Sequence, residues 1–176
     1  MRFGNQILKE LGDVSDLLGS FVDEQVAGFN DPSAGLTVLK AFVSTKGTKR
    51  QITIEELQAF TKTLGKEQSE SDLNNFIQRF ISLRILRDKD ESGRYELRHD
   101  ALAEKVYQKI TLVEKDMLEV NQSINNGLDA FSKRGVLMSK TDLEYVDPYL
   151  KRMFLTEAQD QFVKKSKQAL GRKRRT

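Results

Sequence analysis

Two adjacent residues, His99 and Asp100, are the part of this sequence best suited to chemistry. They follow an extended segment, Tyr95-Glu96-Leu97-Arg98, and come directly before a helical pattern that starts at Ala101. A carboxylate at a helix start caps the helix by accepting a backbone N–H bond, and the same end attracts anions. We therefore expect Asp100 to cap a helix and His99 to stand at an anion-attracting helix start. The simpler interpretation is a plain cap beside a half-buried histidine.

Other types of catalytic or metal site lack the residues that they need. Cysteine is absent, which excludes disulfides, thiol nucleophiles and thiolate metal ligands. A single histidine cannot form a His-rich metal site. The run Gly47-Thr48-Lys49 lacks the upstream glycine of a phosphate-binding loop, and the acidic residues lie on polar helix faces. We therefore expect no catalytic residue, no metal ion and no cofactor in this chain.

The positive charge of the chain is concentrated near its C-terminal end. The formal net charge is +3, but seven basic residues and no acidic one lie within 164–175, which leaves −4 for residues 1–163. A mildly acidic body is not typical of a fold that grips phosphates. We interpret 171–176 as an unstructured basic tail. Contact with nucleic acid, contact with an anionic membrane and a role as a solvated linker all stay open for it.

The sequence predicts no membrane-spanning segment. It has no run of about 18 apolar residues, the length that a transmembrane helix needs. The start, Met1-Arg2-Phe3-Gly4, lacks the apolar stretch of a signal peptide. With cysteine also absent, a cytoplasmic location is the expected one.

Apolar residues recur at helical spacing along most of the chain, which predicts a mainly α fold. Gly12 and Gly19 favour a break or tight packing in the first helix, and Gly127 and Gly135 are expected to interrupt the last helical stretch. Helices are expected over 3–29, 34–44, 54–64, 70–83 and 101–110, the last of them ending there or continuing to 133, with further helix to 170.

The middle of the chain shows the element order of a winged helix. Thr53 with Glu56 predicts a capping box, and Ser69 marks the next helix start. A short extended piece over 51–53 precedes these helices, and the segments 85–88 and 94–97 flank a polar turn, which predicts an antiparallel hairpin. We therefore expect a winged helix, that is, a helix-turn-helix with a β-hairpin wing, flanked by helical segments.

This interpretation divides the chain into four parts. Residues 1–33 form a helical lead, 34–110 the winged-helix domain, 111–170 a helical connector and 171–176 the basic tail.

A winged helix reads DNA with its second helix, and this gives an alternative function. Here that helix carries Asn75, Gln78 and Arg79 on its polar side, and the loop before the first of the two helices adds Lys49 and Arg50. Acidic residues on the same helix outnumber its one basic residue. We therefore favour protein packing over a DNA-binding transcriptional regulator.

Three segments resemble bacterial STAND-class NTPases, which are multidomain signalling ATPases. They are Leu11-Gly12-Asp13-Val14-Ser15-Asp16-Leu17-Leu18-Gly19-Ser20-Phe21, Leu39-Lys40-Ala41-Phe42-Val43-Ser44-Thr45-Lys46-Gly47-Thr48-Lys49-Arg50 and Tyr95-Glu96-Leu97-Arg98-His99-Asp100-Ala101-Leu102. The resemblance covers about residues 5–170 and matches the region that follows the P-loop core. It implies that 1–33 ends the helical region of the ATPase and that 111–170 leads to the next module.

The resemblance implies a regulatory role without catalysis. The winged helix packs on the P-loop nucleotide-binding core, and the histidine of the His-Asp motif reaches the β-phosphate of ADP. His99 would be the phosphate sensor and Asp100 its orienting cap, with ADP or ATP bound by the parent protein. Arg98 stands where the best-known form of the motif has methionine. The implied partners are the nucleotide-binding core and a downstream effector or repeat module, in a parent protein that is either cytoplasmic or membrane-associated.

Overall fold

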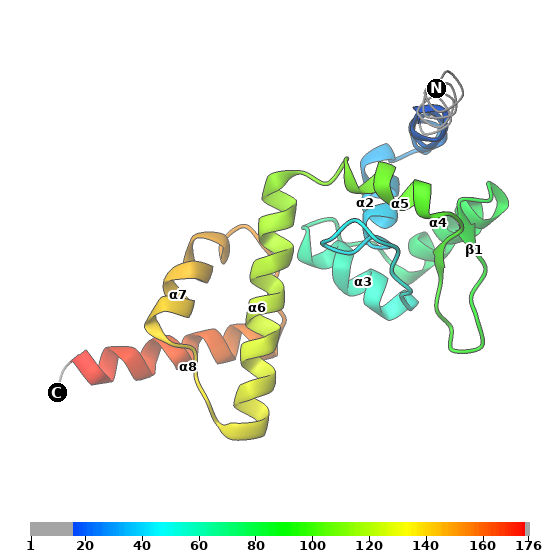
Figure 1. The fold of residues 1–176 in the computed structure, drawn as a ribbon. Helices are drawn as coiled ribbons and strands as arrows, with labels where there is room; N and C mark the ends of the chain where they lie inside the picture. The colour runs from blue at the N-terminus through cyan, green and yellow to red at the C-terminus, as the bar shows by residue number, and fades with distance from the viewer. Residues whose placement is uncertain (1–15, 175–176) are drawn as a thin grey trace, which may run out of the picture. The chain divides into compact units, whose positions relative to one another are not determined.

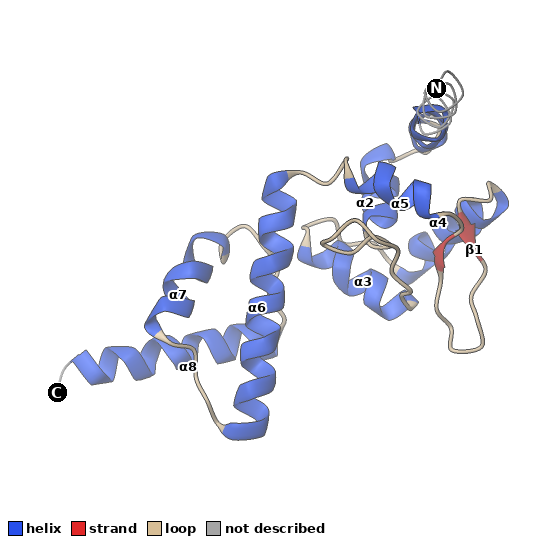
Figure 2. Ribbon diagram, in the orientation of Figure 1, coloured by secondary structure: helices blue, strands red, loops and turns tan. Residues whose placement is uncertain are grey.

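Helices dominate the computed structural model, which describes residues 16–174 (Figures 1 and 2). The predicted mainly α fold is therefore confirmed. The described chain divides into two units: the first holds residues up to 61 together with 66–111, and the second holds 62–65 together with the residues from 112 onward. Within residues 16–174, none of the helices combines the length and apolar character that crossing a bilayer requires.

Up to residue 111 the chain forms five helices and one hairpin among the described residues. Residues 16–27 are one helix that passes through Gly19 without a break, while the earlier part of the predicted helix, with Gly12, lies outside the described residues. The elements that follow are α2 (Pro32–Lys40), α3 (Ile54–Thr63), α4 (Glu70–Ser82), β1 (Leu86–Arg87), β2 (Glu96–Leu97) and α5 (Asp100–Tyr107).

Helix α2 starts two residues earlier and ends four residues earlier than predicted. Asp31 caps it by accepting a hydrogen bond from the backbone N–H of Ala34 at 3.0 Å, and Pro32 stands at the first position, where its missing N–H costs nothing. Asp31 and Pro32 therefore begin this helix. The early end has a separate cause, because Val43 leaves the helix to form a bridge with Lys49.

The hairpin is antiparallel as predicted, and a third segment joins it. Leu86 pairs with Leu97, and both side chains are fully buried. The predicted extended piece is confirmed at Ile52, which exchanges two backbone hydrogen bonds with Tyr95 at 3.0 and 2.8 Å. Because Ile52, Tyr95, Leu86 and Leu97 are all buried, the hairpin is part of the core of the first unit.

Both predicted helix caps are confirmed. The Thr53 hydroxyl accepts from the backbone N–H of Glu56 at 3.2 Å, and the Glu56 carboxylate accepts from the N–H of Thr53 at 2.9 Å. The Ser69 hydroxyl accepts from the N–H of Asp72 at 3.1 Å at the start of α4. Arg94 then ties the hairpin to the first cap, since it bonds Glu56 at 3.2 Å.

The hairpin tip is closed by Asp90. Its carboxylate accepts from the Ser92 hydroxyl at 2.7 Å and from the backbone N–H groups of Ser92 and Arg94 at 2.9 and 3.0 Å. These donors, the Ser92 hydroxyl first, lower the pKa of Asp90 below its usual 3.8 because they favour the charged form. Since the pKa is lower in the folded loop, Asp90 stabilises the tip above its unfolded pKa, and this contribution is lost as the pH falls through the folded pKa.

The second unit contains α6 (Leu112–Arg134), α7 (Lys140–Val146), the 3₁₀ helix η1 (Asp147–Tyr149) and α8 (Glu157–Arg174). One open alternative is decided here, and two expectations are corrected. Helix α5 ends at Tyr107 and is not continuous with α6. Gly127 lies inside α6 and does not interrupt it, whereas Gly135, with φ of 67°, does end it. Helix α8 continues to Arg174, so most of the predicted unstructured tail is helical.

The core of the second unit forms where α6, α7 and α8 pack together. Met117, Val120 and Ile124 of α6 are buried with Phe162 and Val163 of α8. A polar bridge joins the same two helices: the Gln159 side chain, 5% exposed, donates to Asn121 at 3.0 Å and to Asn125 at 2.7 Å. The extended α8 is therefore held along its first half by both apolar and polar contacts.

Gly127 gives the first testable prediction, because α8 packs directly against it. A Cβ at this position would lie 3.0 Å from Cε1 of Phe162, whose ring is 2% exposed and packs on Phe131. We expect Gly127→Ala to lower the free energy of unfolding by about 1 kcal/mol, since the crowded ring outweighs the helix propensity that alanine gains. Urea denaturation followed by circular dichroism measures the change.

Gly171 provides the matched control in the same unit. It is also helical, but no atom lies within 4 Å of a Cβ built there. Gly171→Ala should leave stability unchanged or raise it by up to about 1 kcal/mol. Equal effects of the two substitutions would contradict the close contact between α6 and α8.

Candidate functional site

His99 stands at the start of α5 with its side chain exposed to solvent. Its backbone is extended, with φ of −133° and ψ of 142°, and it is the N-cap residue, although its imidazole makes no capping hydrogen bond. Two backbone bonds fix this position. The N–H of Arg98 donates to Ile85 at 2.9 Å, and the carbonyl of His99 accepts from Leu102 at 3.1 Å.

The prediction that Asp100 caps the helix is wrong. Asp100 is the first helical residue, one position after the cap, and its side chain is 92% exposed. The extended backbone at His99 already serves as the cap position, so the Asp100 carboxylate turns to an ion pair with Lys49 at 3.4 Å instead. A carboxylate in the first turn still interacts favourably with the positive end of the helix dipole. The alternative of a half-buried histidine is also wrong.

Lys49 reaches this site because a tight loop presents it. The Ser44 hydroxyl accepts from the N–H groups of Lys46 and Thr48 at 3.2 and 3.1 Å, and the Ser44 N–H donates to the Thr48 carbonyl at 2.7 Å. Gly47, with φ of 82°, makes the turn, and a Cβ there would lie 3.3 Å from the Tyr107 ring of α5. The loop is therefore folded against α5 itself.

Sequence reasoning missed Lys49 as a neighbour of Asp100. The polar loop was visible, but no local pattern connects it with a helix that starts 51 positions later, as the residue numbers show. Its position is determined by the Val43–Lys49 bridge and the packing of the loop on α5. Next to His99 the structure also holds the Arg98 Nε, a buried donor without a hydrogen-bond partner among the described residues.

The arrangement is suited to binding an anion. The N-terminus of α5 and the Lys49 ammonium attract negative charge, and the exposed imidazole of His99 can donate a hydrogen bond to an anion there. Asp100 pairs with Lys49 at the same helix start. No covalent chemistry follows from these groups, because none of them is paired as a nucleophile with a base. Among residues 16–174 there is also no group of three or more potential ligands that could hold a metal ion.

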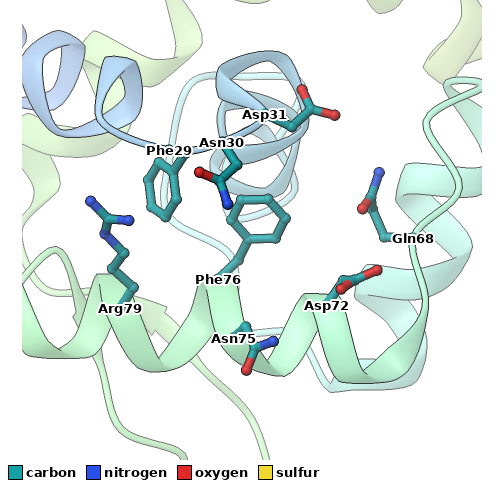
Figure 3. Close-up of a pocket in the computed structure, with 8 residues that line it drawn as sticks. All are labelled: Phe29, Asn30, Asp31, Gln68, Asp72, Asn75, Phe76 and Arg79. Carbon is teal, nitrogen blue, oxygen red and sulfur yellow. The ribbon is translucent and has the colours of Figure 1, made fainter.

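The residues of the DNA-binding alternative occupy different environments. Asn75 and Gln78 are exposed on α4, and Arg50 is exposed after the loop. Arg79 is turned back onto the protein: its guanidinium lies 4.3 Å from the centre of the Phe29 ring, and it donates to the Gly28 carbonyl at 3.3 Å (Figure 3). With Lys49 paired to Asp100, two of the cationic residues expected to contact phosphates have partners inside the first unit.

Comparison of the chain with protein-family models, with curated proteins and with solved structures found no match.

His99 gives a prediction that separates function from stability. Because its side chain is exposed and caps nothing, His99→Ala should change the free energy of unfolding by less than about 0.5 kcal/mol. Leu97→Ala, two residues earlier, removes a fully buried side chain and should cost about 2–5 kcal/mol. Thermal denaturation of both variants tests this, and a large loss of stability for His99→Ala would show a structural role.

Proposed function

We propose that this chain is a non-catalytic regulatory segment of a STAND-class signalling ATPase. In this proposal the first unit is a winged helix that packs on the P-loop nucleotide-binding core and couples the nucleotide state to a downstream effector. The observation that carries the proposal is the exposed imidazole of His99 at the N-terminus of α5, without a capping role, at a helix start where Lys49 pairs with the next residue, Asp100. An exposed imidazole N–H at a helix start is suited to donate a hydrogen bond to a phosphate that another domain holds.

The order of elements supports the winged-helix part of the proposal. A single bridging residue, Ile52, precedes α3 and α4, and the β1–β2 hairpin follows them. Ile52 pairs with Tyr95 on the hairpin, which makes the third strand position of a small antiparallel sheet. Helix α5 then follows the hairpin after a two-residue gap, at Arg98 and His99.

In the proposed mechanism His99 contacts the β-phosphate of ADP in the core of the parent protein. Lys49 and the first turn of α5 add positive potential, and Asp100 keeps Lys49 oriented through their ion pair. The contact stabilises the packing of the winged helix on the core in the ADP state, and exchange for ATP releases it. ADP and ATP are thus ligands of the parent protein, and this chain supplies only the sensing groups.

The second unit is proposed to pass the change onward. Its long helices α6 and α8 connect the first unit with a downstream effector or repeat module in a cytoplasmic or membrane-associated parent. The basic residues in the last turn of α8, Arg172, Lys173 and Arg174, give the end of this helix a positive charge.

DNA binding stays the alternative hypothesis for the first unit. It is supported by the exposure of Asn75 and Gln78 on α4, where amide side chains could reach base edges. The internal contacts of Arg79 and Lys49 and the acidic residues Glu70 and Asp72 in the first turn of α4 weigh against it, because they lower the positive potential that phosphates require.

The proposal predicts that His99 contributes to nucleotide affinity. The test uses the nucleotide-binding core encoded in the same reading frame, titrated with ADP in the presence and absence of this chain. We expect the chain to tighten the binding of ADP to the core. With the His99→Ala variant, the affinity for ADP should be about tenfold lower than with the unmodified chain, which is the value of one hydrogen bond to a charged phosphate. Isothermal titration calorimetry measures the affinities.

Gln108→Ala is the matched control, since Gln108 is exposed at the opposite end of α5. It should leave the gain in ADP affinity intact. A reading frame without a Walker-type loop, or a gain in affinity that does not depend on His99, would contradict the proposed function.

A further inference from the structure

A cavity of about 380 Å³ opens on the first unit between the 29–31 segment and α4. Phe29, Asn30 and Asp31 line it from one side, and Gln68, Asp72 and Phe76 line it from the other (Figure 3). Figure 3 shows Asp31, Gln68 and Asp72 on one side of the Phe76 ring, whereas Arg79 lies on the other side, next to Phe29. The open part of the cavity thus combines an aromatic wall with acidic and amide groups.

Both carboxylates of the cavity keep an oxygen for a ligand. Oδ1 of Asp31 accepts the capping bond from Ala34, and Oδ2 of Asp72 accepts from the Ser69 hydroxyl at 2.8 Å. The second oxygen of each side chain has no hydrogen-bond partner among the described residues, and both side chains are exposed. Each aspartate is therefore fixed by one oxygen and offers the other one to a donor.

One guanidinium group, that of Arg79, already lies against an aromatic ring of this cavity. Arg79 stacks over the Phe29 ring at 4.3 Å and donates to a backbone carbonyl, which is the pairing that arginine favours with aromatic faces. The Phe29 and Phe76 rings lie 5.2 Å apart, so the Phe76 ring presents a second aromatic surface beside the first. A further guanidinium on the Phe76 side would meet two carboxylates that the Arg79 side lacks.

We propose that this cavity binds an arginine side chain presented by a partner protein. The flat guanidinium stacks on Phe76 and donates to Asp31 and Asp72, while the amide oxygen of Gln68 accepts a further bond. Charge complementarity selects this occupant, because two carboxylates repel a phosphate or an acidic peptide. The proposal is independent of the nucleotide-sensing role of His99. It assigns the side of α4 that carries Asp72, Asn75 and Phe76 to a basic protein rather than to DNA.

The experiment titrates the full chain with the blocked tripeptide acetyl-Gly-Arg-Gly-amide. The side-chain NH₂ signals of Asn30 and Gln68 in ¹H–¹⁵N spectra are the readout, since both amides line the cavity. We expect saturable shifts of these signals and none with the citrulline tripeptide, which has the same shape but no charge. The double variant Asp31→Asn/Asp72→Asn should weaken binding at least about threefold.

The double variant keeps the helix start, because asparagine caps a helix as well as aspartate does. Glu70→Gln is the matched control: it removes one charge from the first turn of the same helix, outside the cavity, and should leave the affinity unchanged within about twofold. If the double variant does not fold, the comparison between arginine and citrulline peptides decides the matter on the unmodified chain.

Several results would overturn the proposal. They are the absence of saturable shifts, equal shifts with citrulline, and an affinity that the double variant leaves unchanged. Shifts of the same signals by a DNA duplex would assign the face to nucleic acid. Shifts that grow with the concentration of the chain alone would make a second copy of the chain the occupant.

Discussion

The first unit depends on a small set of buried backbone pairs. Ile52 and Tyr95 exchange two hydrogen bonds, Leu86 pairs with Leu97, and the N–H of Arg98 continues the pattern to Ile85. The apolar side chains on this ladder are almost fully buried, so the hairpin cannot shift its register by one residue without exposing Leu97. The N–H of Arg98, bonded to Ile85, and the carbonyl of His99, which accepts from Leu102, fix the backbone between the hairpin and α5. His99 is consequently held in the open at the start of α5.

Features with a local physical cause could be predicted from the sequence. The capping box of Thr53 and Glu56 and the cap at Ser69 depend on residues three positions apart, and the hairpin depends on a polar turn between two apolar segments. The mainly α fold follows from the spacing of the apolar residues. These interactions form within one short segment, so they can be predicted without knowledge of the rest of the chain.

The errors arose where packing partners or the backbone conformation, rather than residue type, decide the outcome. Gly127 was expected to break a helix, but the Phe162 ring fills the space beside it, and a glycine at that point allows the close approach. The end of α8 was expected to be unstructured on its composition, yet the helix continues from a buried first half. Asp100 was assigned the cap on its type alone, while the extended backbone at His99 places the cap one residue earlier.

In the candidate site, too, some features could be predicted from local patterns and others could not. The position of His99 at a helix start was predictable, because the end of the hairpin and the helical pattern are both local. The approach of Lys49 and the turning of Arg79 onto Phe29 were not, since each joins segments far apart in the chain. These long-range contacts change the functional interpretation most, because they place the Lys49 ammonium beside Asp100 at the start of α5 and turn the Arg79 guanidinium onto Phe29.

Native-state hydrogen exchange tests most directly whether the buried ladder holds His99 in place. The amides of Ile52, Tyr95 and Arg98 donate to Tyr95, Ile52 and Ile85 respectively, and they should exchange among the slowest of the first unit. The amides of Lys89 and Glu91 at the hairpin tip should exchange much faster, since both residues are exposed and outside the ladder. If the Arg98 amide exchanged as fast as those of the tip, the backbone before His99 would not be fixed, and the account would be contradicted.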